Sequence, residues 1–252
     1  MAGAARDWPR VIGHRGAAQA APENTLAGFR KAAALGVGWV EFDVRLSRDG
    51  QAIVLHDDTL ERTTTGRGEA AALDFAELRR LDAGAWFGPA FRGERVPGLE
   101  ETIALLAELG LGAVIELKPA PGAEAATGGR VAALVAERWP DVLPAPLLSS
   151  FKPAALAAAR SAAPAIERAL LVETVPPSWR AQVEALGCAG LHAEQRQLEH
   201  DTVAALTAAG LAVFAYTVNQ PERARTLWSW GVAAVFSDCP DRLAAGLGAH
   251  PI

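Results

Sequence analysis

The feature that most constrains the fold is a regular alternation of short β-type runs with Ala- and Leu-rich helical stretches. Such alternation is typical of a parallel sheet with crossover helices, and eight parallel strands in one domain favour closure into a barrel. The length of 252 residues also suits one barrel domain. We therefore predict an α/β fold, a (β/α)8 TIM barrel, as a single domain over residues 1–252.

The expected strands and helices can be placed along the chain. The β-type runs occupy residues 11–13, 39–44, 113–117, 146–149, 168–172, 190–192, 212–217 and 233–237. Helices are expected at residues 25–35, 122–138, 153–162, 178–186, 201–209 and 222–230, several of them ended by glycine. After the second strand the alternation breaks off, because a short run, QAIVLH, leads into polar, Gly-rich sequence. We interpret residues 57–97 as a small insertion at the catalytic rim.

Composition excludes several classes of function. Half of the residues are apolar and 21% are charged, as in globular proteins, and the net charge of −5 gives no general attraction for nucleic acid or anionic membrane. The N-terminal stretch lacks the apolar run of a signal peptide, and no run approaches the ~20 apolar residues of a membrane span. We expect a cytoplasmic protein with no integral membrane association. The two cysteines, Cys188 and Cys239, lack metal-type spacing.

The first strand runs into the sequence GHRG, which brings His14 and Arg15 to the end of a strand where barrel enzymes place catalysis. A turn or a surface His–Arg pair is the alternative interpretation of this motif alone. The sequence PENT follows, and its Asn24 and Thr25 are good N-cap residues for the next helix. Glu23 in the same motif is a further candidate to face the site.

Carboxylates alternate along the second strand, WVEFDVRL. Glu41 and Asp43 are two residues apart and therefore share one face, while apolar neighbours such as Phe42 occupy the other. Both acids are thus expected to point into the barrel, where unpaired charge is costly. Inward salt bridges to arginine are one explanation, and a bound cation is another.

The third predicted strand, AVIELKP, repeats this pattern with Glu116 and Lys118. Together with Glu41 and Asp43, Glu116 makes an all-oxygen set of possible ligands. Such a set suits one hard divalent cation, Mg²⁺ or Ca²⁺, better than zinc with nitrogen or sulfur ligands.

Two histidines stand where the rim is expected. His56 ends the run QAIVLHDD, and with His14 it provides two imidazoles for acid and base roles. Taken alone, His56 is equally compatible with an exposed loop histidine. His192 ends the sixth predicted strand and is a further pocket candidate, and Tyr216 in FAYTVN could line the pocket with its ring.

The order of these motifs resembles the glycerophosphodiester phosphodiesterase family. The similarity runs through GHRGAAQAAPENTLAGF, VEFDVRLSRDGQAIVLHDDTLERTT, VPGLEETIALL, IELKP, AYTVN and GVAAVFSDCPDRL. The resemblance implies that His14 and His56 form the acid–base pair and that Arg15 and Lys118 contact phosphate. It also implies that the three carboxylates, Glu41, Asp43 and Glu116, hold the metal. The family usually has tryptophan before TVN, so Tyr216 puts the preference for the alcohol group in doubt.

The implied function is metal-dependent hydrolysis of glycerophosphodiesters, such as glycerophosphocholine or glycerophosphoethanolamine, to sn-glycerol 3-phosphate and an alcohol. The expected partner is this small-molecule substrate. Three alternatives remain at this point: a related phosphodiesterase acting on lysophospholipids, a non-catalytic barrel that binds phosphate esters, and a metal-dependent lyase or aldolase on the same fold. The presence of both histidines and all three carboxylates argues against a non-catalytic barrel.

Overall fold

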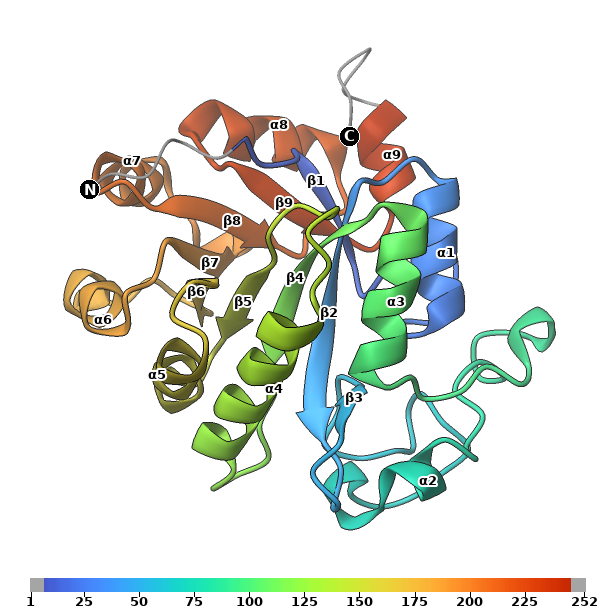
Figure 1. Ribbon diagram of the computed structural model, residues 1–252. Helices are drawn as coiled ribbons and strands as arrows, with labels where there is room; N and C mark the ends of the chain where they lie inside the picture. The colour runs from blue at the N-terminus through green and yellow to red at the C-terminus, as the bar shows by residue number, and fades with distance from the viewer. Residues whose placement is uncertain (1–6, 246–252) are drawn as a thin grey trace.

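Hydrogen bonds between neighbouring strands close a parallel barrel with helices on its outside (Figure 1). The computed structural model describes residues 7–245, and within them eight parallel strands follow the order β1-β9-β8-β7-β6-β5-β4-β2, with β2 paired back to β1. They are β1 (Val11–His14), β2 (Trp39–Leu46), β4 (Gly112–Leu117), β5 (Leu147–Ser150), β6 (Glu167–Val172), β7 (Gly190–Glu194), β8 (Ala212–Tyr216) and β9 (Ala234–Ser237). The predicted (β/α)8 TIM barrel is confirmed.

Six helices match the predicted stretches. They are α1 (Leu26–Ala34), α4 (Glu124–Arg138), α5 (Pro153–Ala162), α6 (Trp179–Leu186), α7 (His200–Ala208) and α8 (Pro221–Trp230). Two further α-helices outside the predicted stretches follow later strands or loops, α3 (Leu99–Leu109) and α9 (Pro240–Ala245). In α3 the buried residues Leu99, Ile103 and Leu106 follow the helical spacing that covers one face.

Side chains alternate along the strands and divide the core into two layers. Ile12, Val114 and Phe214 belong to a cluster inside the barrel. Phe42 and its outward-facing neighbours on β2 pack against the helices, and the ring of Phe42 meets that of Phe29 in α1 at 5.3 Å. The predicted outward face of β2 is thus apolar, which leaves the opposite face for the carboxylates.

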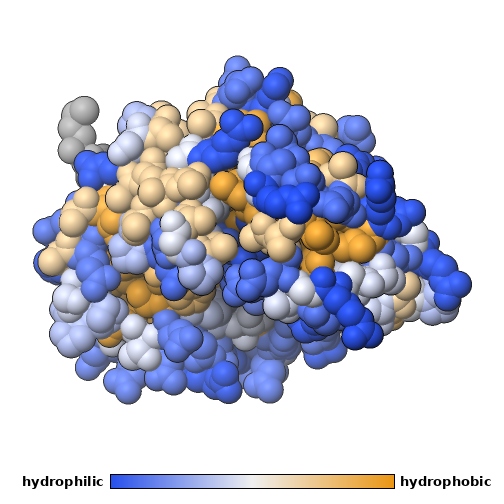
Figure 2. Space-filling model, turned by 90° about the horizontal axis from the view of Figure 1, so that it is seen from below, coloured by the Kyte–Doolittle hydropathy of each residue, from blue (hydrophilic) through white to orange (hydrophobic). Residues whose placement is uncertain are grey.

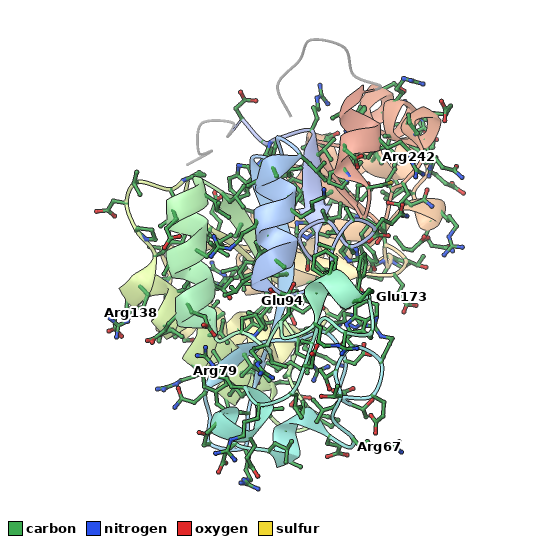
Figure 3. All side chains as sticks on the ribbon, turned by 90° about the vertical axis from the view of Figure 1, so that its right-hand side faces the viewer. Arg67, Arg79, Glu94, Arg138, Glu173 and Arg242 are labelled. Atoms are coloured by element: carbon green, nitrogen blue, oxygen red, sulfur yellow. The ribbon has the colours of Figure 1, made fainter. Side chains whose placement is uncertain are left out.

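The segment between β2 and α3 extends beyond the barrel, as Figure 1 shows below the end of β2. It contains β3 (Ala52–Val54), which pairs antiparallel with β2, then η1 (Ala70–Ala72), α2 (Phe75–Leu78) and η2 (Pro89–Phe91). Seven of its buried apolar residues form a small core of their own. The carboxylate of Glu94 accepts a hydrogen bond from the N–H of Ala27 at the start of α1, where Figure 3 shows Glu94.

The ends of the predicted domain, residues 1–6 and 246–252, lie outside the described residues. In the part of the chain between them, no helix combines the length and the apolar character needed to cross a membrane. The face drawn in Figure 2 is largely hydrophilic, with hydrophobic residues in separate patches.

Candidate active site

A tight turn carries the chain out of β1 and over the carboxylates of β2. A Cβ atom on Gly13 would lie 2.1 Å from the carbonyl oxygen of Gly16, and Gly16, at φ +93°, packs on the backbone of Gly28 in α1. Arg15 itself has a positive φ of 51°, which is uncommon for a side chain of this size. Its N–H donates to a carboxylate oxygen of Glu41 at 3.2 Å. The glycines therefore serve close backbone packing that brings Arg15 to the carboxylates.

Three carboxylates converge inside the mouth of the barrel, as predicted. Glu41 and Asp43 come from β2, and Glu116 stands beside Asp43 in the register of β4. All three are buried, and each offers an oxygen within 4.8 Å of the others. Burial and the charge of Asp43 raise the pKa of Glu116 to about 7 and raise that of Glu41 well above its usual value. This mutual repulsion in a set of oxygen donors fits a divalent cation, which would relieve it.

Cations of the protein partly offset these charges. Arg15 Nε lies 3.4 Å and Lys118 Nζ 3.9 Å from the carboxylate of Asp43, and the Asn24 amide donates to it at 2.8 Å. Although burial opposes the change, Arg15, then His56 and Lys118, lower the pKa of Asp43. The salt bridge to arginine, the alternative to a bound cation, is therefore present, but Arg15 also pairs with Glu23 at 2.7 Å. Negative charge remains in excess among the buried groups.

The two predicted histidines each bind a carboxylate through Nδ1. His14 Nδ1 lies 2.6 Å from Asp238, which follows β9, and His56 Nδ1 lies 2.6 Å from Asp57. When a carboxylate accepts from Nδ1–H, Nε2 is the nitrogen left to face the site. His14 Nε2 is 3.8 Å from Glu41, and His56 Nε2 is 3.0 Å from Lys118 Nζ. Both imidazoles are thus oriented toward the carboxylate cluster.

The aspartates are expected to act by positioning the imidazoles. Replacing Asp238→Asn should lower kcat by roughly 10- to 100-fold, because the amide does not hold the Nδ1–H tautomer of His14. A matched control is Asp201→Asn, which alters the exposed pair of Asp201 with His200 at 3.0 Å. Steady-state kinetics of both variants test this, and unchanged kcat in Asp238→Asn would remove the positioning role.

His56 is held in its neutral form by its surroundings. Burial lowers the pKa of His56, and the charges of Arg15 and Lys118 lower it further against the opposing effect of Asp43. Because the ammonium of Lys118 can only donate, the nearby Nε2 of His56 must accept. A lone pair on Nε2 is what a general base requires.

A pocket of about 170 Å³ joins these residues. Its lining includes seven of the predicted site residues, namely His14, Arg15, Glu41, His56, Glu116, Lys118 and Tyr216, together with His192. The Tyr216 hydroxyl donates to the carbonyl oxygen of Val172 at 2.8 Å, and its ring meets Phe151 edge-on at 6.0 Å. The structure therefore brings the predicted set together, since Asp43, which is not part of the lining, contacts both Arg15 and Lys118.

His192 should make the fold sensitive to acid. Burial lowers its pKa to about 3 from an ordinary value of 6.5. Between these values the unfolded chain binds one more proton at this site, so stability falls as pH falls, by about 1.4 kcal/mol per unit. We expect a loss of roughly 2 kcal/mol between about pH 6.5 and about pH 5 that is missing in His192→Phe. Urea unfolding of both proteins at the two pH values measures it, and equal losses would contradict it.

Several site residues were not assigned from the sequence. Asp238 and Asp57 orient the histidines, and Asn24 binds Asp43 rather than only beginning a helix, since Thr25 alone caps α1. Asp57 directly follows His56, and Asp238 directly follows the last strand, so position at strand ends was the available signal. Their pairing with particular histidines depends on contacts across the barrel.

Comparison with known proteins agrees with this geometry. A model of the glycerophosphoryl diester phosphodiesterase family matches residues 14–242. A glycerophosphodiester phosphodiesterase of Caldanaerobacter subterraneus is 31% identical over 239 residues, covering 92% of this chain and 95% of the relative.

Solved structures show the same likeness. An Oleispira antarctica phosphodiesterase in complex with its product sn-glycerol 3-phosphate is 41% identical with a TM-score of 0.93, covering 96% of this chain and 97% of that one. A glycerophosphodiester phosphodiesterase of Agrobacterium tumefaciens is 30% identical with a TM-score of 0.80, covering 94% and 100%. The chain therefore belongs to the glycerophosphoryl diester phosphodiesterase family, which confirms the resemblance and the predicted enzyme class.

Proposed function

We propose that this enzyme hydrolyses glycerophosphodiesters, such as glycerophosphocholine and glycerophosphoethanolamine, to sn-glycerol 3-phosphate and an alcohol with the help of one divalent cation. The observation that carries the proposal is the convergence of two carboxylate-oriented histidines on a buried carboxylate cluster in one pocket. The product bound by the Oleispira antarctica relative supports the same chemistry.

Arg15 and Lys118 are assigned to the phosphate. Both line the pocket, and both already lie among carboxylates that hold them in place. A phosphodiester entering a protein of net charge −5 needs such local positive charge. The guanidinium of Arg15 can bind two phosphate oxygens, while Lys118 offers a compact charge beside His56.

The carboxylates of Glu41, Asp43 and Glu116 would hold the cation. Their oxygen chemistry suits Mg²⁺ or Ca²⁺, and their separation allows all three to reach one ion. When bound, such an ion neutralises the phosphate and acidifies a hydroxyl group near it.

The histidines divide the proton transfers. His56 removes the proton from the attacking hydroxyl, the glycerol 2-hydroxyl or a water, because its Nε2 carries a lone pair. His14, held by Asp238 on the other side of the cluster, protonates the departing alkoxide. If a cyclic phosphate forms first, the roles are exchanged in its hydrolysis.

Amino alcohols are the head groups that the pocket edge favours. The rings of Tyr216 and Phe151 meet there edge to face, and aromatic rings attract ammonium groups. Burial raises the pKa of Tyr216, and the nearby charges of Glu116, Glu173 and Glu194 raise it further. These three carboxylates make this edge of the pocket acidic. Figure 3 shows Glu173, which directly follows β6.

Lysophospholipids are the second candidate substrates. An acyl chain would need apolar surface at the rim, and Phe151 is an exposed large hydrophobic residue in the pocket lining. The other exposed large hydrophobic residues in the described chain, Trp86 and Val142, are absent from that lining. One phenylalanine therefore makes this candidate weaker.

Phosphorus NMR of the products tests the proposed reaction. The protein with Mg²⁺ or Ca²⁺ is incubated with glycerophosphocholine, glycerophosphoethanolamine or a lysophospholipid. We expect sn-glycerol 3-phosphate from the first two and little turnover of the third. Phosphocholine as the phosphorus product would place cleavage on the wrong side of the phosphate and overturn the proposal.

A further inference from the structure

His192 has an environment that neither packing nor the proposed chemistry explains. It lies on β7 with no exposed surface, its ring stacked on Phe214 at 4.6 Å and meeting Phe236 edge-on at 5.2 Å. Both ring nitrogens lack a hydrogen-bond partner among residues 7–245. A buried nitrogen without a partner costs free energy, and an apolar ring would fill the same space without that cost.

The position of His192 points to a ligand. It lines the same pocket as Arg15, Lys118 and the two proposed catalytic histidines. Leu171, beside it in the register of β6 and β7, and Phe236 give this part of the pocket an apolar lining. The volume of about 170 Å³ is well below the 300–1,000 Å³ of typical drug-sized sites, and it suits a group no larger than a glycerol phosphate.

The chemistry of a neutral imidazole selects the partner. Burial keeps His192 uncharged, so one nitrogen donates and the other accepts. A hydroxyl can bind either nitrogen because it both donates and accepts. An oxygen of an ionised phosphodiester carries no proton, so it can only accept from the N–H. With the phosphate at Arg15 and Lys118, the glycerol carbons would lie against the apolar lining.

We propose that His192 binds the terminal hydroxyl of the glycerol half of the substrate and so makes this enzyme selective for glycerol esters. The inference rests on the proposed function, since it takes the phosphate to lie among the charged residues. His192 is a positioning residue for binding and takes no part in proton transfer.

The test crosses an enzyme variant with a substrate variant. Glycerophosphoethanolamine is compared with the analogue in which hydrogen replaces the terminal hydroxyl, the 2-hydroxyl being kept. Wild-type enzyme should prefer the parent substrate by at least about tenfold in kcat/KM, the value of one neutral hydrogen bond. His192→Phe should show no preference between the two substrates. His192→Gln, which keeps a donor and an acceptor, should regain part of the wild-type preference.

Binding and stability provide independent readings. By calorimetry, wild-type enzyme should bind sn-glycerol 3-phosphate at least about tenfold more tightly than its 1-deoxy analogue, and His192→Phe should bind both alike. A histidine kept only for packing predicts equal losses on both substrates and a lower melting temperature in His192→Phe. Equal kcat/KM and equal affinity for parent and analogue in wild-type enzyme would overturn the inference even if the variants fail to fold. Failure of the proposed function is distinguishable, because wild-type enzyme would then turn over neither substrate.

Discussion

Replacing His56→Ala is expected to lower kcat for glycerophosphodiester hydrolysis by roughly 10²–10⁴-fold. The variant loses the imidazole whose Nε2 is proposed to accept the proton, while the proposed phosphate contacts of Arg15 and Lys118 remain. The barrel should stay folded, because His56 lies after β3 at the rim and contributes nothing to the apolar core. Steady-state kinetics and a melting curve of the same preparation measure both parts.

The same reasoning applies to His14→Ala on the acid side. The matched control is His200→Ala, since His200 is exposed and pairs with an aspartate away from the pocket. That variant should keep wild-type kinetics. Near-normal kcat in both His14→Ala and His56→Ala would defeat the assignment of the two histidines.

Replacing Glu116→Gln is expected to lower kcat/KM by about 10³-fold, because loss of one proposed cation ligand removes several kcal/mol of transition-state stabilisation. The metal-free variant should melt no lower than wild-type enzyme above about pH 7. Burial and the neighbouring Asp43 make the Glu116 carboxylate unfavourable there, and the amide removes this repulsion. Activity and stability should thus change in opposite directions.

Melting curves with and without Mg²⁺ or Ca²⁺ complete this test. Wild-type enzyme should gain stability from the ion, since binding to the folded state alone raises the melting temperature, and Glu116→Gln should gain far less. Glu137→Gln, at an exposed position on α4, is the control and should respond like wild type. An equal gain in wild type and Glu116→Gln would show that the ion binds elsewhere.

Strand periodicity explains why so much of this fold could be predicted. Alternation along β2 indicates in advance that Phe42 faces the helices while Glu41 and Asp43 face the interior, and the register with β4 then sets Glu116 beside Asp43. The predicted helices do not include α3, although its buried residues follow the helical period. It directly follows the irregular segment after β3, where the alternation of strands and helices is interrupted.

Contacts across the barrel explain what the sequence could not predict. His14 and Asp238 are separated by 224 positions and meet only because β9 pairs with β1 when the barrel closes. The pKa of His56 is lowered by burial and by the charges of Arg15 and Lys118, which follow the strands β1 and β4. Likewise, the sequence places His192 at the end of a predicted strand. Only the packed structure shows that its ring nitrogens lack a hydrogen-bond partner among the described residues.

The central claim is best tested by following release of sn-glycerol 3-phosphate from glycerophosphoethanolamine with a coupled dehydrogenase. Metal-stripped enzyme is assayed with chelator and then with Mg²⁺ or Ca²⁺. The account predicts no release in chelator and full release once a suitable ion is restored. Equal release in chelator, or silence with either ion from a protein shown to be folded, would contradict it.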